Sequence, residues 1–187
     1  MFSPNIDNRS QHENPKLKYY VAETLDSIKN YFSELIGAMP VFDNYVTVRD
    51  LPLETQTVRF HDRKGTRTYE IPKGKVFGEY NTDTEQIVLD SSLFDSVKKK
   101  YLQDKGFDVP SPERVIGEEA IHHVQNRTGS MHRALREYGS AARDYIEGAA
   151  SSLADYLFGS TDIYQYEKSL FRKEAEKKGI QDAFLVA

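Results

Sequence analysis

The chain contains no cysteine and no tryptophan among its 187 residues. Without cysteine it can have neither a disulfide framework nor a thiolate metal site, and this absence fits a reducing compartment. The chain also lacks an apolar run near the roughly 20 residues that span a bilayer. Its first ten residues show no apolar core of a signal peptide. These absences predict a cytoplasmic protein with no membrane partner.

Positive charge is also in short supply. Lysine and arginine number 25 against 29 aspartates and glutamates, so the formal net charge is −4. A protein that binds nucleic acid through a general basic field needs the opposite balance, and we therefore expect no nucleic-acid partner. The length and the 39% hydrophobic content are typical of one globular domain with its own core.

What the chain does contain is a set of helical patterns around a group of short β-rich runs. Residues 1–15 are polar and include two prolines, so we expect a flexible N-terminal tail there and a single domain over residues 16–187. The pattern predicts an α+β fold with an N-terminal helix, a small mixed or antiparallel sheet and later helices. The expected segments are a helix at 17–37, three to five strands within 41–90, and helices at 90–102, 112–126, 130–157 and 163–178.

The stretch at 115–125 reads Val-Ile-Gly-Glu-Glu-Ala-Ile-His-His-Val-Gln and contains two adjacent glutamates and two adjacent histidines. On a helix, Glu118 and His122 lie four residues apart and project from the same face. Glu119 lies beside Glu118, close enough to reach a water molecule held by that pair. Two ligands one turn apart, with a carboxylate next to them as a base, are what a metal–water site needs.

A further carboxylate, Glu147, lies among small and apolar residues of the expected helix at 130–157. A carboxylate in such surroundings must be exposed, paired with a cation or coordinating something. The sequence alone leaves these three alternatives open.

The order of these elements resembles the zincin metallopeptidases, and among them the gluzincin branch in its minimal form. The hallmark of that branch is His-Glu-x-x-His on one helix with a glutamate ligand on the next. Residues 115–125 are similar to the first helix with its first histidine replaced by Glu118, and residues 145–157 are similar to the second. The resemblance covers about residues 70–170 and implies a zincin-like domain.

Residue by residue, the resemblance implies metal ligands at Glu118, His122 and Glu147 and a general base at Glu119. The implied cofactor is zinc. A carboxylate in place of an imidazole would make the ion a weaker Lewis acid. It would also suit manganese, iron or magnesium better than a site with two histidines does. The implied substrate is a peptide or protein in an extended conformation along the sheet edge, where Gly78 would either admit the peptide or mark a bulge.

Four other side chains are assigned around this expected site. Tyr164 or Tyr166 would donate a hydrogen bond to a tetrahedral oxyanion. His123 points about 100° away from His122 on a helix, so we expect it to pack or hydrogen-bond beside the site rather than bind the same ion. Arg143 would help to offset the carboxylates.

Three functions compete at this point. The first is a metal-dependent peptidase or related hydrolase with an EExxH…E site. The second is a catalytically inactive zincin-fold binding or scaffolding protein that has lost the metal and keeps a buried ion-pair cluster. The third, a di-iron bundle, fits Glu119-x-x-His122 but needs a second such motif and four long helices. The apolar segment 183–187 also suggests a latency device that fills the cleft of its own chain or, in a homodimer, of a neighbouring chain.

Overall fold

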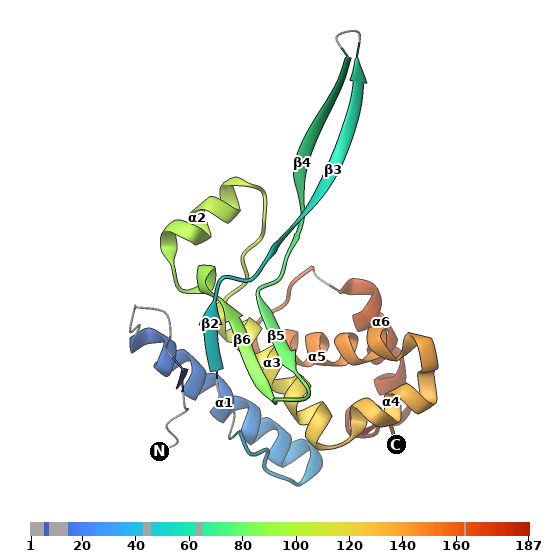
Figure 1. The fold of residues 1–187 in the computed structure, drawn as a ribbon. Coiled ribbons are helices and arrows are strands. Elements are labelled where there is room, and N and C mark those ends of the chain that lie inside the picture. The colour runs from blue at the N-terminus through green and yellow to red at the C-terminus, as the bar shows by residue number, and fades with distance from the viewer. Residues whose placement is uncertain (1–5, 8–14, 43–45, 63–64, 163) are drawn as a thin grey trace.

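In the computed structural model the strands, apart from a two-residue one near the N-terminus, follow one another in the chain between the first helix and the remaining helices, which confirms the predicted α+β class (Figure 1). The structure describes residues 6–7, 15–42, 46–62, 65–162 and 164–187. Of the expected tail at 1–15, these include only a two-residue strand and Pro15, where the first helix begins. The elements are β1 (Ile6–Asp7), α1 (Pro15–Ile36), β2 (Val46–Arg49), β3 (Leu53–Asp62), β4 (Gly65–Lys75), β5 (Gly78–Asn81), β6 (Gln86–Asp90), η1 (Ser91–Leu93), α2 (Ser96–Asp104), α3 (Pro112–Arg127), α4 (Ser130–Tyr138), η2 (Gly139–Ala141), α5 (Ala142–Phe158), α6 (Gln165–Lys178) and α7 (Ile180–Leu185).

The main sheet is mixed, as expected, and its strand order is β1-β2-β6-β5. Strands β1, β2 and β6 run parallel to one another, while β5 is antiparallel to β6. Ile87 of β6 is buried and pairs with Val46 on one side and Tyr80 on the other. Strand β5 therefore forms an edge of the described sheet, and this edge borders the cleft described below.

Strands β3 and β4 do not join this sheet. They pair with each other along their whole length, from Leu53↔Lys75 to Asp62↔Gly65, and the hairpin projects away from the helices (Figure 1). The main sheet therefore has a strand number within the expected three to five, but two of the β-rich runs lie outside it because they satisfy their backbone hydrogen bonds locally in a long hairpin. The residues Arg-Lys-Gly at 63–65 favour a hairpin turn by their sequence, and the first two of them lie outside the described residues.

The base of the hairpin is held by one buried carboxylate at the end of β6. Asp90 is 1% exposed, and its Oδ2 accepts hydrogen bonds from the Leu51 amide at 2.7 Å and from Lys75 Nζ at 2.5 Å. Lys75 Nζ also donates to the Leu51 carbonyl at 2.5 Å. Leu51 precedes β3 and Lys75 ends β4. Asp90 therefore holds the start of β3 and the end of β4 together through charge-assisted hydrogen bonds.

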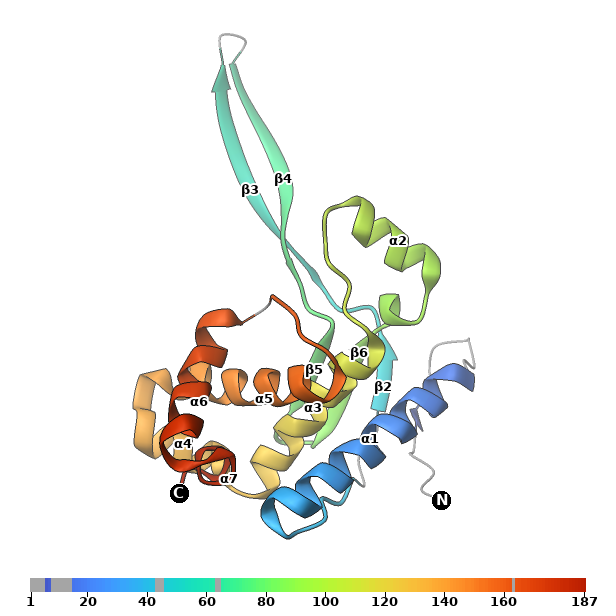
Figure 2. The same cartoon turned by 180° about the vertical axis from the view of Figure 1, so that it is seen from behind.

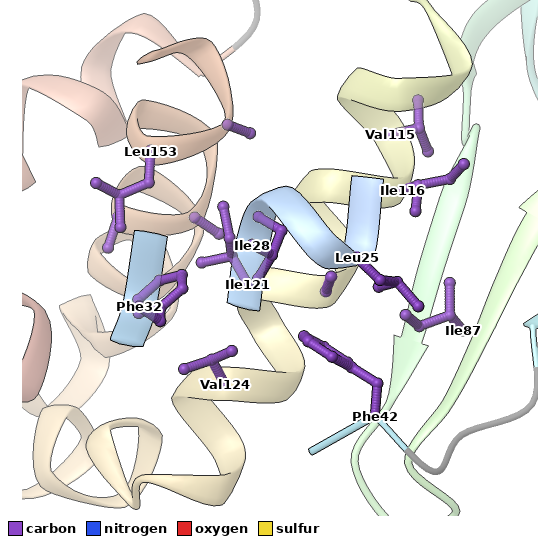
Figure 3. Close-up of a cluster of buried hydrophobic side chains, with 14 of the residues drawn as sticks. Leu25, Ile28, Phe32, Phe42, Ile87, Val115, Ile116, Ile121, Val124 and Leu153 are labelled. Atoms are coloured by element: carbon purple, nitrogen blue, oxygen red, sulfur yellow. The ribbon is translucent and has the colours of Figure 1, made fainter. Parts of the chain in front are cut away.

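Helix α1 covers the core as its spacing predicts. Leu25, Ile28 and Phe32 are buried and face α3, where Ile121 and Val124 meet them (Figure 3). Gly37, at φ 67°, ends the helix in the left-handed conformation that favours glycine. No helix in the described part of the chain is long and apolar enough to cross a membrane.

Helix α3 begins as its sequence predicts. Ser111 is the N-cap and its hydroxyl accepts a hydrogen bond from the Arg114 amide at 3.2 Å, with Pro112 in the first turn. The helices around it are shorter than expected. Gly139, at φ 55°, divides the predicted helix at 130–157 into α4 and α5. Asp90 caps only η1, while Asp95 caps α2.

The apolar C-terminal segment folds into the core instead of a cleft. It forms α7, in which Ala183 and Phe184 are buried. The Phe184 ring lies 4.8 Å from the Phe32 ring of α1, and the Tyr145 hydroxyl donates to the Ala183 carbonyl at 2.8 Å. Figure 2 shows α7 next to the C-terminal end of α1. The expectation that this segment fills the cleft of its own chain is therefore wrong, because its apolar side chains complete the core.

We predict that Phe184→Ala lowers the free energy of unfolding by about 3–5 kcal/mol, because it removes a buried ring that packs on Phe32 and leaves a cavity. Chemical denaturation followed by circular dichroism measures this loss. Ile180→Ala on the same helix is the control, since Ile180 is 45% exposed and its truncation should cost about 1 kcal/mol or less. Equal losses in the two variants would contradict the docking of α7.

Candidate metal centre

A cleft of about 590 Å³ opens between the edge strand β5 and helices α3 and α5. Residues 75–80 line one wall, α3 contributes residues from Arg114 to His122, and α5 contributes residues from Arg143 to Glu147. Thr161 and Tyr164, from the connection between α5 and α6, also line the cleft. The cleft thus lies at the stretch 115–125, which contains the paired glutamates and histidines.

The structure brings Glu118, His122 and Glu147 together in this cleft. Each offers one ligand atom, and these atoms all lie within 4.8 Å of one another. His122 Nε2 is 3.3 Å from Glu147 Oε2. Two ligand atoms bound to one zinc ion at about 2.1 Å lie roughly 3.4 Å apart. The His122–Glu147 pair already has that separation, and only Glu118 would have to approach.

The carboxylate of Glu118 supplies a test of whether a cation fits. Its Oε2 accepts a short hydrogen bond from Arg114 Nη1. Its Oε1 is buried and accepts no hydrogen bond from the described residues. A buried carboxylate oxygen without a donor is costly, and a divalent cation between the three ligands would satisfy it. The residues present therefore fit a metal ion.

His122 is oriented by Gln125, three residues further along α3. Gln125 Nε2 donates to the Ile146 carbonyl at 3.1 Å, which turns the amide oxygen towards His122 Nδ1 at 2.8 Å. When His122 is neutral, its Nδ1–H donates to Gln125, and its Nε2 carries the lone pair that a cation would need. Such a partner fixes the tautomer that a metal-binding histidine requires.

Charge inside the cleft shifts the pKa values of this pair in opposite directions. Burial by itself lowers the pKa of His122, but the hydrogen bond to Glu147 and the surrounding carboxylates outweigh it and raise the pKa to about 9. Burial raises the pKa of Glu147, but the hydrogen bond from His122 together with the charges of His122 and Arg143 outweighs burial, so that this pKa lies below its ordinary value. Without a cation the two residues therefore form an imidazolium–carboxylate pair.

Glu119 lies beside the three candidate ligands and is 9% exposed. Burial raises its pKa to about 8, and the negative charges of Glu118 and Glu147 add to this rise, against the lowering effect of His122. A carboxyl group whose pKa lies close to neutrality is suited to take up and release a proton. The role of Glu119 as a general base, which the sequence resemblance implies, stays a prediction.

Gly78 makes room for Glu119. A Cβ atom at residue 78 would lie 2.6 Å from Glu119 Oε1 and 2.6 Å from Val115 Cγ1. The backbone of β5 therefore lies directly against α3 at this point. The bulge considered for Gly78 is absent, since the β5–β6 register runs without a shift from Gly78↔Leu89 to Asn81↔Gln86. The glycine allows close packing of the cleft wall.

Of the two tyrosines considered as oxyanion donors, the structure places one at the cleft. Tyr164 lines it, and burial together with the nearby carboxylates raises its pKa to about 12, so the hydroxyl keeps its proton. Tyr166 is 64% exposed and does not line the cleft. Helix α6 begins at Gln165, and the helical turn carries Tyr166 away from the side on which Tyr164 lies.

His123 and Arg143 occupy different surroundings. His123 is 1% exposed, with hydrogen bonds to the Val41 carbonyl at 2.9 Å and to the Tyr80 hydroxyl at 3.3 Å, and its ring lies against Phe42. These contacts place it on the core side of α3, and it does not line the cleft. Arg143 does line the cleft, one helical turn before Glu147, and its charge contributes to the low pKa of that carboxyl.

Sequence reasoning missed a buried charge cluster behind Glu118. Arg114 is 3% exposed; its Nε donates to Asp155 Oδ1 at 3.1 Å and its Nη2 to Ser151 Oγ at 2.7 Å. Lys168, which is fully buried, donates to Asp155 Oδ2 at 2.5 Å. The available signal was the spacing of Arg114 four residues before Glu118, which puts the two on one helix face. Gln125 carried the same kind of signal relative to His122.

We predict that Gly78→Ala lowers the free energy of unfolding by about 1–3 kcal/mol, because the added methyl group overlaps Glu119 and Val115. Urea denaturation measures the change. Glu79→Ala is the matched control on the same strand; its side chain is exposed, makes a 3.5 Å ion pair with Arg49, and should contribute about 1 kcal/mol or less. A fully stable Gly78→Ala protein would show that β5 does not lie against α3.

Comparison with known proteins adds no relative. No family model matches the chain, no curated protein matches it, and no solved structure matches its fold. The assignment of a function therefore depends on the cleft and its residues.

Proposed function

We propose that this protein is a metal-dependent hydrolase of peptide bonds with a zincin-like fold. The observation that carries the proposal is the convergence of Glu118, His122 and Glu147 in one cleft, where a buried oxygen of Glu118 has no described hydrogen-bond donor. The element order supports it: the antiparallel edge strand β5 and strand β6 precede α3, and α5 follows with Glu147. This is the order on which the resemblance of the sequence rests.

The proposed cation would be held by two carboxylates and one imidazole. Zinc accepts such ligands, and manganese or iron suits the same set because carboxylate oxygens are harder donors than imidazole. When bound, the ion would supply the Lewis acid that polarises the scissile carbonyl and acidifies a water molecule. Gln125 would keep His122 in the tautomer whose Nε2 faces the ion.

Glu119 would act as the general base and acid of the reaction. It would take a proton from the attacking water and pass it to the leaving amine, and burial, which raises the pKa of this carboxyl above its ordinary value, makes it a stronger base than an exposed glutamate. Tyr164 would donate its hydroxyl proton as a hydrogen bond to the oxyanion that develops on the substrate. Its pKa of about 12 keeps that donor protonated.

The proposed substrate is a peptide in an extended conformation. Strand β5 is an edge of the described sheet, and the residues that lead into it and form it line the cleft. An extended peptide can add to such an edge through main-chain hydrogen bonds and lie across the candidate ligands. Arg143, at the start of α5, would lie beside it.

We predict that the protein, purified without chelator, binds one zinc or manganese ion per chain, and that Glu147→Gln weakens this binding at least about tenfold because one anionic ligand is lost. Elemental analysis and competition with a chromophoric chelator measure it. Asp144→Asn, on the same helix but outside the cleft lining, should leave the affinity unchanged. A wild-type protein that binds no divalent ion would refute the proposal.

We predict further that Glu119→Gln keeps the metal and lowers the rate of peptide hydrolysis about 10²–10⁴-fold, because the amide cannot accept the proton. Cleavage of a fluorogenic peptide library, assayed together with the metal content, measures both quantities. Glu113→Gln, in the first turn of α3 and outside the cleft lining, is the control. Equal activity of Glu119→Gln and wild type would exclude Glu119 as the base.

A binding module without catalysis is the second candidate, and one observation favours it. Arg114 pairs with Glu118, and His122 pairs with Glu147, so much of the charge in the cleft is offset without a metal ion. In that case the thermal midpoint of the protein would be the same with a chelator and with excess zinc. A hydrolase with an occupied site would be stabilised by the ion.

A further inference from the structure

Glu118 lies next to a buried cation on its own helix. Together, Glu118 and Glu147 place two negative charges around one neutral imidazole. The closest cation to Glu118 is Arg114, whose side chain is only 4% exposed and which lies one turn earlier on α3. Arg114 contacts Glu118, Ser151 and Asp155 through three different nitrogen atoms. It is therefore built into the wall behind the candidate ligand.

Counted as a unit, the cluster behind Glu118 is neutral. Arg114 and Lys168 supply two positive charges, and Asp155 and Glu118 supply two negative charges. All four side chains are at most 15% exposed. Water therefore screens these charges poorly, and the removal of one member leaves a net buried charge. Glu147 remains as the one candidate ligand whose charge this cluster does not offset.

We propose that Arg114 is a positioning residue that makes Glu118 usable as a metal ligand. Arg114 takes Oε2 of Glu118 and offsets its charge, which leaves the buried Oε1 for the cation. With this partner, the three ligands and their support carry the single net negative charge that two neutral ligands and one carboxylate would carry. The inference depends on the proposed function, since it concerns the same metal ion.

The charge of Arg114 also determines the effect that we expect of Glu118→His on zinc binding. Glu118→His adds an imidazole, which by itself is a good zinc ligand. In this chain, however, it also leaves Arg114 with an excess positive charge next to the cation. The substitution should therefore weaken zinc binding as long as Arg114 is present, and it should be tolerated once that charge is removed.

A double-mutant cycle in the full-length protein tests this, with zinc affinity from chelator competition as the readout. We expect Glu118→His to weaken zinc binding at least about tenfold in the wild-type background. In the Arg114→Met background, the fold-loss of zinc affinity caused by Glu118→His should be at least about ten times smaller. Arg172→Met is the matched control. Arg172 lies 3.9 Å from Asp155 but is 54% exposed, so the cost of Glu118→His should be unchanged there.

A second route keeps Arg114 in place. Ser151 Oγ lies 2.7 Å from Arg114 Nη2, so Ser151→Asp gives the guanidinium a new carboxylate partner when Glu118→His has removed the old one. We expect the Glu118→His/Ser151→Asp protein to bind zinc at least about tenfold more tightly than Glu118→His alone. Thermal unfolding with a chelator present shows that each variant is folded.

The outcomes separate this inference from the proposed function. If the wild type binds no divalent ion, both are overturned. If the wild type binds zinc and Glu118→His costs the same in the presence and absence of Arg114, and Ser151→Asp gives no rescue, the inference alone is overturned. A purely structural role for Arg114 would change the unfolding midpoint of the variants and leave the zinc affinities additive.

Discussion

The burial of helix α3 on two sides is the constraint on which the rest of the structure depends. Every residue from Arg114 to Gln125 is buried except Glu118, which is partly exposed to the cleft. Ile121 and Val124 face α1 (Figure 3). His122 and Glu119 lie on the side of the cleft, which α5 and β5 also line. A helix buried on both sides can keep polar residues only where partners meet them. Helix α3 thus supplies side chains both to the cleft and to the hydrophobic core.

The two adjacent histidines of α3 are tied to different elements. His123 bonds to Val41 and Tyr80 on the core side. His122 bonds to Gln125, which is itself anchored on the Ile146 carbonyl of α5. These bonds fix how α3 is rotated relative to its neighbours. A rotation that brought His123 into the cleft would leave its buried partners unsatisfied, and for this reason the two adjacent histidines have separate roles.

Much of this helix could be predicted from the sequence because its determinants are local. Ser111 and Pro112 fix where the helix begins, and the four-residue spacing fixes that Glu118 and His122 share a face. The approach of Glu147 rested on a resemblance, because no local rule places α5 beside α3. The partner of Arg114 across the helix interface, Asp155, is a long-range contact of the same kind. Periodicity gives faces of helices and leaves open which faces meet.

Two partner choices that the sequence left open have one physical cause, which is competition between alternative partners. The β-rich runs could pair in one sheet or with each other, and two of them form a long hairpin held by Asp90. The apolar segment at 183–187 could cover any apolar surface, and the core beside Phe32 takes it. Composition records that such a segment needs burial, whereas the partner is decided by the packing of distant elements.

The cluster behind Glu118 also connects the two walls of the cleft. Lys168 Nζ donates to the Thr161 carbonyl at 2.7 Å as well as to Asp155, and the Thr161 amide donates to Asp155 Oδ1 at 3.3 Å. Thr161 lies in the connection that leads to Tyr164. The position of Glu118 on one wall and of Tyr164 on the other are therefore fixed by the same buried aspartate. A charge change at position 118 therefore acts on this whole cluster. In the proposed metal site, the carboxylate of Glu118 is matched in charge by the arginine behind it.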